Sequence, residues 1–170
     1  MNSSEGVTAL DRVEAAALAP IELWSDQKLL RALVSQQFQV SGPVLADEVL
    51  PDERVGFFVP IDVDDRGQDL PGALVITDTR LIVHYSTPTK EEVWCAELAA
   101  VVFEQSKFRK GILAGWRSVF HITAPANLTV VCVDLNKDGP LGYIVGGLLS
   151  GTITMRWTAE GRPEGLTMEA

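Results

Sequence analysis

The chain has 170 residues, of which 46% are hydrophobic and 22% are charged, and its formal net charge is −9. Its length suits one domain with a full core, and its composition excludes a chain that is disordered throughout. Because a strongly acidic protein repels phosphate groups, the charge argues against nucleic acid as a partner, and only a local basic patch could attract an anionic membrane.

The N-terminal part of the sequence has the spacing of amphipathic helices. Apolar residues, Trp24 among them, recur at helical intervals over residues 10–38, with a break at Pro20. Pro43 is expected to end this pattern, because a proline inside a helix removes a hydrogen bond. We therefore predict a helical arm over residues 1–42, whose apolar face packs on the rest of the protein or on a second copy.

The pattern then changes from helical spacing to alternation. Over residues 55–63 the apolar side chains occupy every second position, which predicts a strand with one buried face. Pro60 argues against a central place in a sheet for this strand, because proline cannot donate to the ladder. Six further strands, with no helix between them, are predicted at residues 72–77, 80–86, 91–98, 99–105, 115–124 and 127–135. This succession excludes alternating strands and helices and favours a barrel or a sandwich.

The residues after the last predicted strand return to a helical pattern. We expect a helix over residues 141–150, a short helical extension over 152–157 and a mobile polar tail over 159–170. Glycines such as Gly142 and Gly147 allow another backbone to approach this helix closely. The close approach would serve either tight packing on the strands or a contact between copies of the chain.

Four stretches of the sequence carry motifs that occur together in one family. Residues 72–86 hold two apolar strands joined by the turn Thr77-Asp78-Thr79-Arg80, and Asp52-Glu53 precedes the first strand. Residues 95–107 lead from one strand into the next, and residues 139–149 form the closing helix. In this order, the stretches resemble the bacterial PH-like and GRAM-like domains.

The resemblance covers about residues 45–155. It implies an α+β, mostly β fold: a seven-stranded PH-like antiparallel β-barrel with a C-terminal capping helix, preceded by the helical arm. The PH-like domain is then placed at residues 43–158 and the tail at residues 159–170. The family also implies a non-catalytic domain that binds lipid headgroups, peptides or other protomers. Members of the family that hold phosphoinositides use basic residues around the loop after the first strand. A pocket of that kind is not expected here, because this loop has only Arg66 to offset Asp62, Asp64, Asp65 and Asp69.

Side chains suited to catalysis or metal binding are few. His84 and His121 lie inside predicted strands, where we expect structural roles, and Cys95 and Cys132 lie in apolar runs that indicate buried thiols without a disulfide. Residues 134–139 have the spacing of a calcium loop, but an apolar residue stands where the bidentate carboxylate should be. We therefore predict no enzymatic activity, no cofactor and no metal.

Residues 106–117 reverse the charge of the chain locally, because they include four basic residues and no acidic one. Aromatic residues alternate with the basic ones, a combination that suits an anionic membrane surface or an acidic partner. The alternative is a long hairpin whose apolar side chains pack on the helical arm while its charges face water. The candidate binding residues are Lys107, Phe108, Arg109, Lys110, Trp116 and Arg117.

Together these patterns predict a non-catalytic PH-like binding module that mediates protein–protein interaction or self-assembly, with a protein partner or a homo-oligomer. The alternative function is peripheral binding to an anionic membrane through residues 106–117. Because the sequence shows no secretory signal and no apolar run of about 20 residues, we expect a cytoplasmic protein, with the membrane surface as its alternative location.

Overall fold

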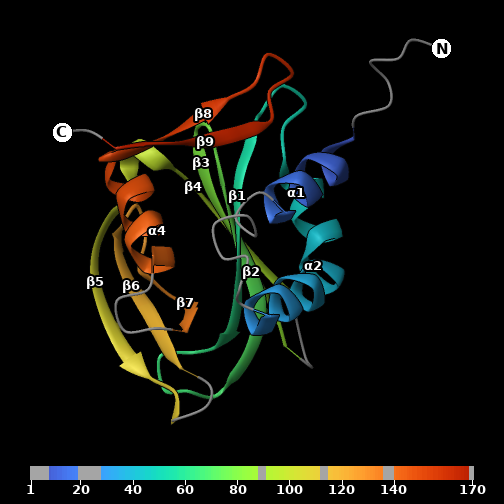
Figure 1. Cartoon of the computed structure of the whole chain (residues 1–170). Helices are drawn as coiled ribbons and strands as arrows, with labels where there is room; N and C mark the ends of the chain where they lie inside the picture. The colour runs from blue at the N-terminus through green and yellow to red at the C-terminus, as the bar shows by residue number, and fades with distance from the viewer. Residues whose placement is uncertain (1–7, 19–27, 88–90, 112–114, 136–139, 169–170) are drawn as a thin grey trace.

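The computed structural model describes residues 8–18, 28–87, 91–111, 115–135 and 140–168, and the protein is α+β and mostly β, as predicted. One antiparallel sheet contains, in order, β1 (Val55–Val63), β2 (Asp69–Thr77), β3 (Arg80–Ser86) and β4 (Glu91–Glu97). A second contains β5 (Val102–Arg109), β6 (Trp116–Ala124) and β7 (Leu128–Leu135). Strands β8 (Ile153–Trp157) and β9 (Pro163–Met168) form a separate hairpin, as Figure 1 shows.

The seven predicted strands do not form one closed barrel. Within the described residues, no ladder of hydrogen bonds joins β1 to β7, or β4 to β5 across the 3-10 turn η3 (Leu98–Ala100). The two sheets meet where β1 lies against β7, and η3 carries the chain from one sheet to the other. Alternation along a strand identifies its faces but not its neighbours, so the prediction of a single seven-stranded barrel is wrong.

The helical arm consists of α1 (Ala9–Leu18) and α2 (Lys28–Glu48), which cover one face of the four-stranded sheet (Figure 1). Thr8 and Asp11 cap the start of α1 reciprocally: each backbone N–H donates to the other's side-chain oxygen, at 3.0 and 3.1 Å. Contacts of α1 with β1, and of α2 with β1, β2 and β3, confirm the prediction that the arm packs on the rest of the protein. Trp24 lies outside the described residues.

Helix α2 continues past Pro43, where the sequence pattern predicted its end. Leu45, Ala46 and Val49 follow the proline and are buried against the sheet. Burial of these side chains outweighs the cost of about 3 kcal/mol for a proline inside a helix. The boundary predicted between the helical arm at residues 1–42 and the PH-like domain at residues 43–158 therefore falls inside α2.

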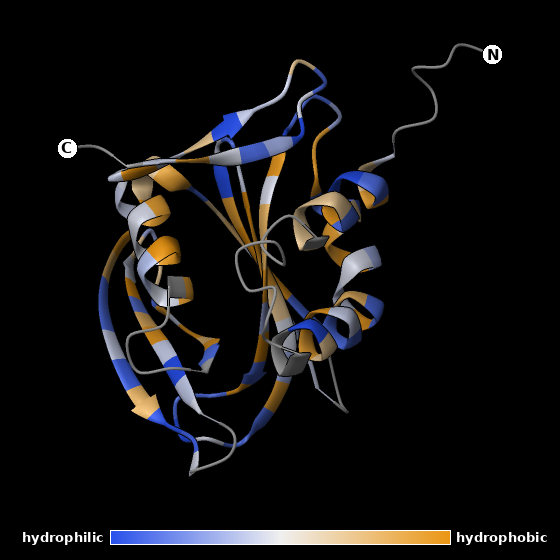
Figure 2. Ribbon diagram, in the orientation of Figure 1, coloured by the Kyte–Doolittle hydropathy of each residue, from blue (hydrophilic) through white to orange (hydrophobic). Residues whose placement is uncertain are grey.

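Strand β1 is buried on both of its faces and not on one, which corrects the prediction of a half-buried strand. The predicted inward positions, such as Phe57, are buried, but so is the neighbouring Phe58, because α2 covers the opposite face. Pro60 is accommodated because β1 is an edge strand of its sheet, as predicted. Figure 2 shows the hydrophobic residues concentrated on the strands between the two N-terminal helices and the C-terminal helix α4 (Pro140–Ser150).

The chain after α4 forms the hairpin β8–β9, so the predictions of a helical extension and of a mobile tail are both wrong over residues 153–168. Gly151 has φ +83°, a left-handed conformation that ends the helix at little cost. Gly147 brings α4 close to the hairpin, since a β-carbon there would collide with the Ile153 side chain. In the described part of the chain, no helix is both long and apolar enough to span a membrane.

Candidate functional site

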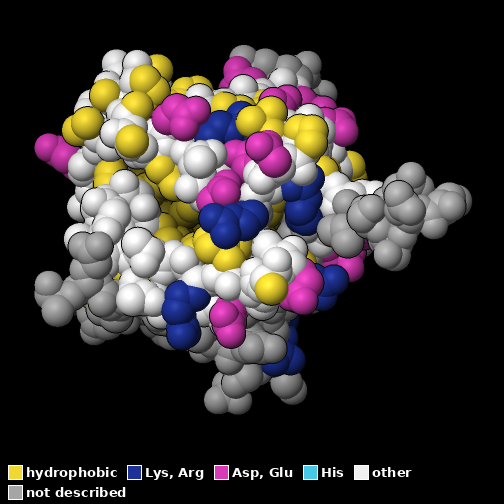
Figure 3. All heavy atoms as spheres, turned by 90° about the horizontal axis from the view of Figure 1, so that it is seen from above, with side chains coloured by type: hydrophobic (Ala, Val, Ile, Leu, Met, Phe, Trp, Pro, Cys, Tyr) yellow, Lys and Arg dark blue, Asp and Glu magenta, His cyan; other side chains and the backbone are white. Residues whose placement is uncertain are grey.

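A pocket of about 480 Å³ opens at the end of the molecule where the β2–β3 turn, η3, the end of α4 and β8 converge. We call it the upper pocket. Figure 3 shows this end from above, hollowed beside basic side chains and with hydrophobic side chains in its depth. Its volume falls within the range of pockets that hold small molecules in other proteins.

Aliphatic side chains form part of the walls of the upper pocket, and polar groups form the rest. Ile76 comes from β2, Leu98 from η3, Leu148 and Leu149 from α4, and Ile153 from β8. β8 packs back on α4, and η3 links β4 of one sheet to β5 of the other. Such walls favour a ligand that buries apolar surface.

Two charged residues and a tryptophan stand among the lining residues of the upper pocket. Arg54 Nε lies 3.2 Å from Asp78 Oδ2, and the Arg54 guanidinium carbon lies 4.7 Å from the centre of the Trp157 ring. The backbones are joined as well, because the Asp78 N–H donates to the Arg54 carbonyl at 2.9 Å. Arg54 is therefore held on two sides, by a carboxylate and by an aromatic face.

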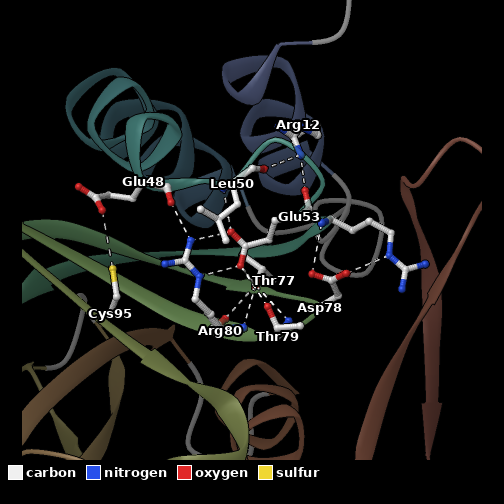
Figure 4. Close-up of polar contacts among 10 residues, drawn as sticks. Arg12, Glu48, Leu50, Glu53, Thr77, Asp78, Thr79, Arg80 and Cys95 are labelled. Carbon is white, nitrogen blue, oxygen red and sulfur yellow. Dashed lines mark hydrogen bonds and ion pairs between the residues drawn. The ribbon is translucent and has the colours of Figure 1, made fainter. Parts of the chain in front are cut away.

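Behind this pocket, a buried ion pair joins the start of β1 to the β2–β3 turn (Figure 4). Arg80 donates to both carboxylate oxygens of Glu53, at 2.7 and 2.8 Å, and to the backbone carbonyl of Glu48 at 2.7 Å. Thr77 donates to the same carboxylate at 2.7 Å. These contacts explain the Thr-Asp-x-Arg turn: Thr77 and Arg80 hold Glu53, while Asp78 holds Arg54.

The described residues of the predicted basic segment lie on or next to β5 and β6, toward the ends of these strands that are far from the upper pocket (Figure 1). Arg117 is only 2% exposed and donates to both Asp62 oxygens, at 2.9 and 2.8 Å. Lys110 lies 3.8 Å from the same carboxylate, and Lys107 lies 3.3 Å from Asp134. Three of the four predicted cations are therefore paired within the molecule, and they share two carboxylates, one on β1 and one on β7.

Neither aromatic side chain of this segment projects fully into solvent. Phe108 packs with Val63, Val119 and Val131 of neighbouring strands, and not on the helical arm as the packing alternative predicted. Trp116 is half-buried, whereas Arg109 is exposed. The connection at residues 112–114 lies outside the described residues. A role for these residues in partner or lipid binding stays a prediction.

The histidines occupy structural positions. His84 is fully buried, its Nδ1 lies 2.8 Å from the Ser41 hydroxyl of α2, and burial lowers its pKa below the ordinary value. His121 lies 3.2 Å from the Thr129 hydroxyl across the β6–β7 ladder. These contacts hold α2 on the sheet and β6 beside β7.

The two thiols differ from each other, and neither forms a disulfide. Burial raises the pKa of Cys132, which keeps that thiol neutral. Cys95 is exposed, so its predicted burial is wrong: it lies on β4, an edge strand that the helices do not cover as they cover β1 to β3. Among the described residues, no three His, Cys, Asp or Glu side chains are grouped as metal ligands, and residues 136–139 of the calcium-like loop lie outside them.

The sequence analysis did not predict the upper pocket, although the sequence contains a strand pattern for one of the elements that line it. Ile153, Met155 and Trp157 alternate with polar residues, which is a strand pattern, but they were assigned to a helical extension. No family model matches this chain, and no curated protein matches it either.

Proposed function

We propose that this chain is a non-catalytic binding module of the PH-like kind, and that it buries an apolar group of a protein partner or of a second copy in the upper pocket. The order of elements supports the PH-like assignment, because four and then three antiparallel strands precede α4. The observation that carries the function is the upper pocket itself, a space of about 480 Å³ whose walls are partly aliphatic and partly polar.

The charges at the pocket support binding rather than chemistry. The lining residues Arg54 and Asp78 already pair with each other, so neither stands ready as a general acid or base. The chain also exposes apolar side chains of a size that such a pocket accepts. Leu50, Val102 and Tyr143 are 51%, 58% and 59% exposed, respectively. A second copy is therefore a partner that the chain itself can supply.

The self-association is testable by filling the pocket. Ala99 is an exposed residue of η3 that lines the pocket, whereas its exposed neighbour Ala100 does not. We expect the wild-type chain to form a reversible dimer in sedimentation velocity between about 5 and 200 μM, in the weak range of association. Ala99→Trp should weaken the dimer at least tenfold, and the matched control Ala100→Trp should not. A chain that stays monomeric at every concentration would contradict self-assembly.

Attachment to an anionic membrane through residues 106–117 was the alternative function. Asp62 and Asp134 already hold three of the four cations of this segment, and the net charge of −9 opposes such binding. In flotation assays with vesicles of phosphatidylserine and phosphatidylcholine, we therefore expect no binding that rises as salt is lowered. Salt-sensitive flotation that is lost on Arg109→Ser would instead support the membrane function.

A further inference from the structure

Arg54 pairs with its carboxylate differently from two other arginines of the protein. Arg80 and Arg117 each hold a carboxylate with both Nε and a terminal amino group. Arg54 reaches Asp78 with Nε alone, and the Trp157 ring lies against its guanidinium. Among the described residues, the two terminal amino groups of Arg54 have no hydrogen-bond partner.

A guanidinium held in this way is prepared for an anion. The two terminal amino groups form a fork that matches two oxygens of a carboxylate or a sulfonate. The contacts to Asp78 and Trp157 fix the plane of the fork before a ligand arrives, so little side-chain entropy is lost on binding. The side chain is 47% exposed, so an incoming anion can reach it.

The apolar part of the same ligand has a place beside this fork. Arg54, Asp78 and Trp157 line the upper pocket together with the aliphatic side chains of α4 and β8, such as Leu149 and Ile153. An apolar body in the pocket and an anionic group at Arg54 would therefore be satisfied at the same time. A cation is not expected in this position, because Arg54 already occupies both the Trp157 face and the Asp78 carboxylate.

We propose that the upper pocket binds a free small amphipathic anion, consisting of an apolar or aromatic body that carries one carboxylate or sulfonate. The Arg54 guanidinium holds the anionic group, and the aliphatic walls hold the body. The inference rests on the proposed use of the upper pocket as the binding site. It adds a regulatory consequence, because such an anion would compete with the apolar group of a protein partner for the same space.

The long-range field of the protein limits the affinity without preventing binding. The net charge of −9 repels anions, but charges separated by more than about 8 Å are largely screened at physiological salt. The local balance at the pocket is neutral, since Arg54 and Asp78 cancel. Asp78 is nevertheless a competitor of the ligand, because its carboxylate already draws on the guanidinium.

Two fluorescent probes with the same ring system test the proposal. The first is 8-anilinonaphthalene-1-sulfonate, and the second is N-phenyl-1-naphthylamine, which lacks the sulfonate. Titrations monitored by probe fluorescence give the affinity of each. We expect Arg54→Met to lower the affinity for the sulfonate about tenfold and to leave that for the neutral probe within about twofold, since a hydrogen-bonded charge contributes on this scale.

A second variant keeps the arginine and changes only its competitor. Asp78→Asn should raise the affinity for the sulfonate severalfold, because an amide competes less for the guanidinium, and should leave the neutral probe unaffected. Thermal unfolding of each variant shows whether it is folded. If neither Arg54→Met nor Asp78→Asn changes the affinity for the sulfonate, the proposal of an anion site is wrong.

The pair of η3 variants separates the failure of this proposal from the failure of the proposed function. Ala99→Trp should weaken both probes at least tenfold, and Ala100→Trp should weaken neither. If Ala99→Trp weakens both probes but the sulfonate is insensitive to Arg54, the pocket binds apolar groups and only the anion is rejected. If Ala99→Trp changes neither probe, the upper pocket is not the binding site, and both proposals fail.

Discussion

Replacing Glu53 with glutamine is expected to lower the free energy of unfolding by about 3 kcal/mol at neutral pH. Glu53 is only 4% exposed, and it accepts hydrogen bonds from Arg80 and Thr77. Removing one partner of a buried ion pair leaves the other charge uncompensated, which costs about 3 to 5 kcal/mol. The Arg80 side chain is 15% exposed, so partial hydration places the expected cost at the lower end of this range.

The pH dependence of this cost follows from the pKa of Glu53. Burial alone would raise that pKa, but hydrogen bonds from Arg80 and Thr77 outweigh burial and lower it from 4.5 to about 2. Because the pKa is lower in the folded than in the unfolded protein, the stabilisation is complete above pH 4.5 and is lost as the pH falls toward 2. The difference between wild type and Glu53→Gln should therefore shrink between pH 4.5 and pH 3.

Urea denaturation of both proteins at pH 7, 4 and 3 measures this difference directly. Glu97→Gln is a matched control, because Glu97 is an exposed carboxylate near the same arginine, and it should change stability by less than about 0.5 kcal/mol. A wild type and a Glu53→Gln variant that differ by the same amount at all three pH values would show that the ionised pair contributes nothing.

The sequence predicts the elements of this fold better than their assembly. The alternation of apolar residues predicts the strands from β1 to β7, and the turn at residues 77–80 lies where its motif predicts it. The separation into two sheets is not predicted, because strand pairing depends on contacts between distant segments. Pro43 shows the same limit, since its effect on α2 is decided by the burial of Leu45 and its neighbours and not by local propensity.

The charged sites show why a basic segment in a sequence does not identify a binding surface. Arg117 and Asp62 are 55 positions apart, and so no local pattern predicts that they meet. Arg117 shares a strand face with Val119, which indicates burial. The number of basic residues nearby nevertheless led to the prediction of an exposed surface. The Arg54 site is harder still to foresee, because it needs β1, the β2–β3 turn and a hairpin predicted as helix and tail.

The helical arm covers one face of β1, and this contact leads to a second prediction with a large expected effect on stability. Phe58→Ala should lower the free energy of unfolding by about 3 to 5 kcal/mol, as much as Phe57→Ala on the opposite face, because both rings are buried. A strand with one buried face would tolerate the loss of Phe58 at less than 1 kcal/mol. Chemical denaturation of the two variants measures both values, with the exposed Val102→Ala as a control expected to change stability by less than about 0.5 kcal/mol.

Phe58 contacts a ring of the helical arm, so a variant of that ring tests how the arm packs on β1. Phe38 of α2 contacts Phe58 edge to face, with ring centres 6.1 Å apart. Such a pair contributes about 1 kcal/mol beyond the surface that it buries. Phe38→Ala and Phe58→Ala together should therefore destabilise the protein by about 1 kcal/mol less than the sum of the single variants. Additive effects would mean that α2 does not place Phe38 against β1, and a cost of Phe58→Ala below 1 kcal/mol would mean that the arm leaves this face of the sheet open.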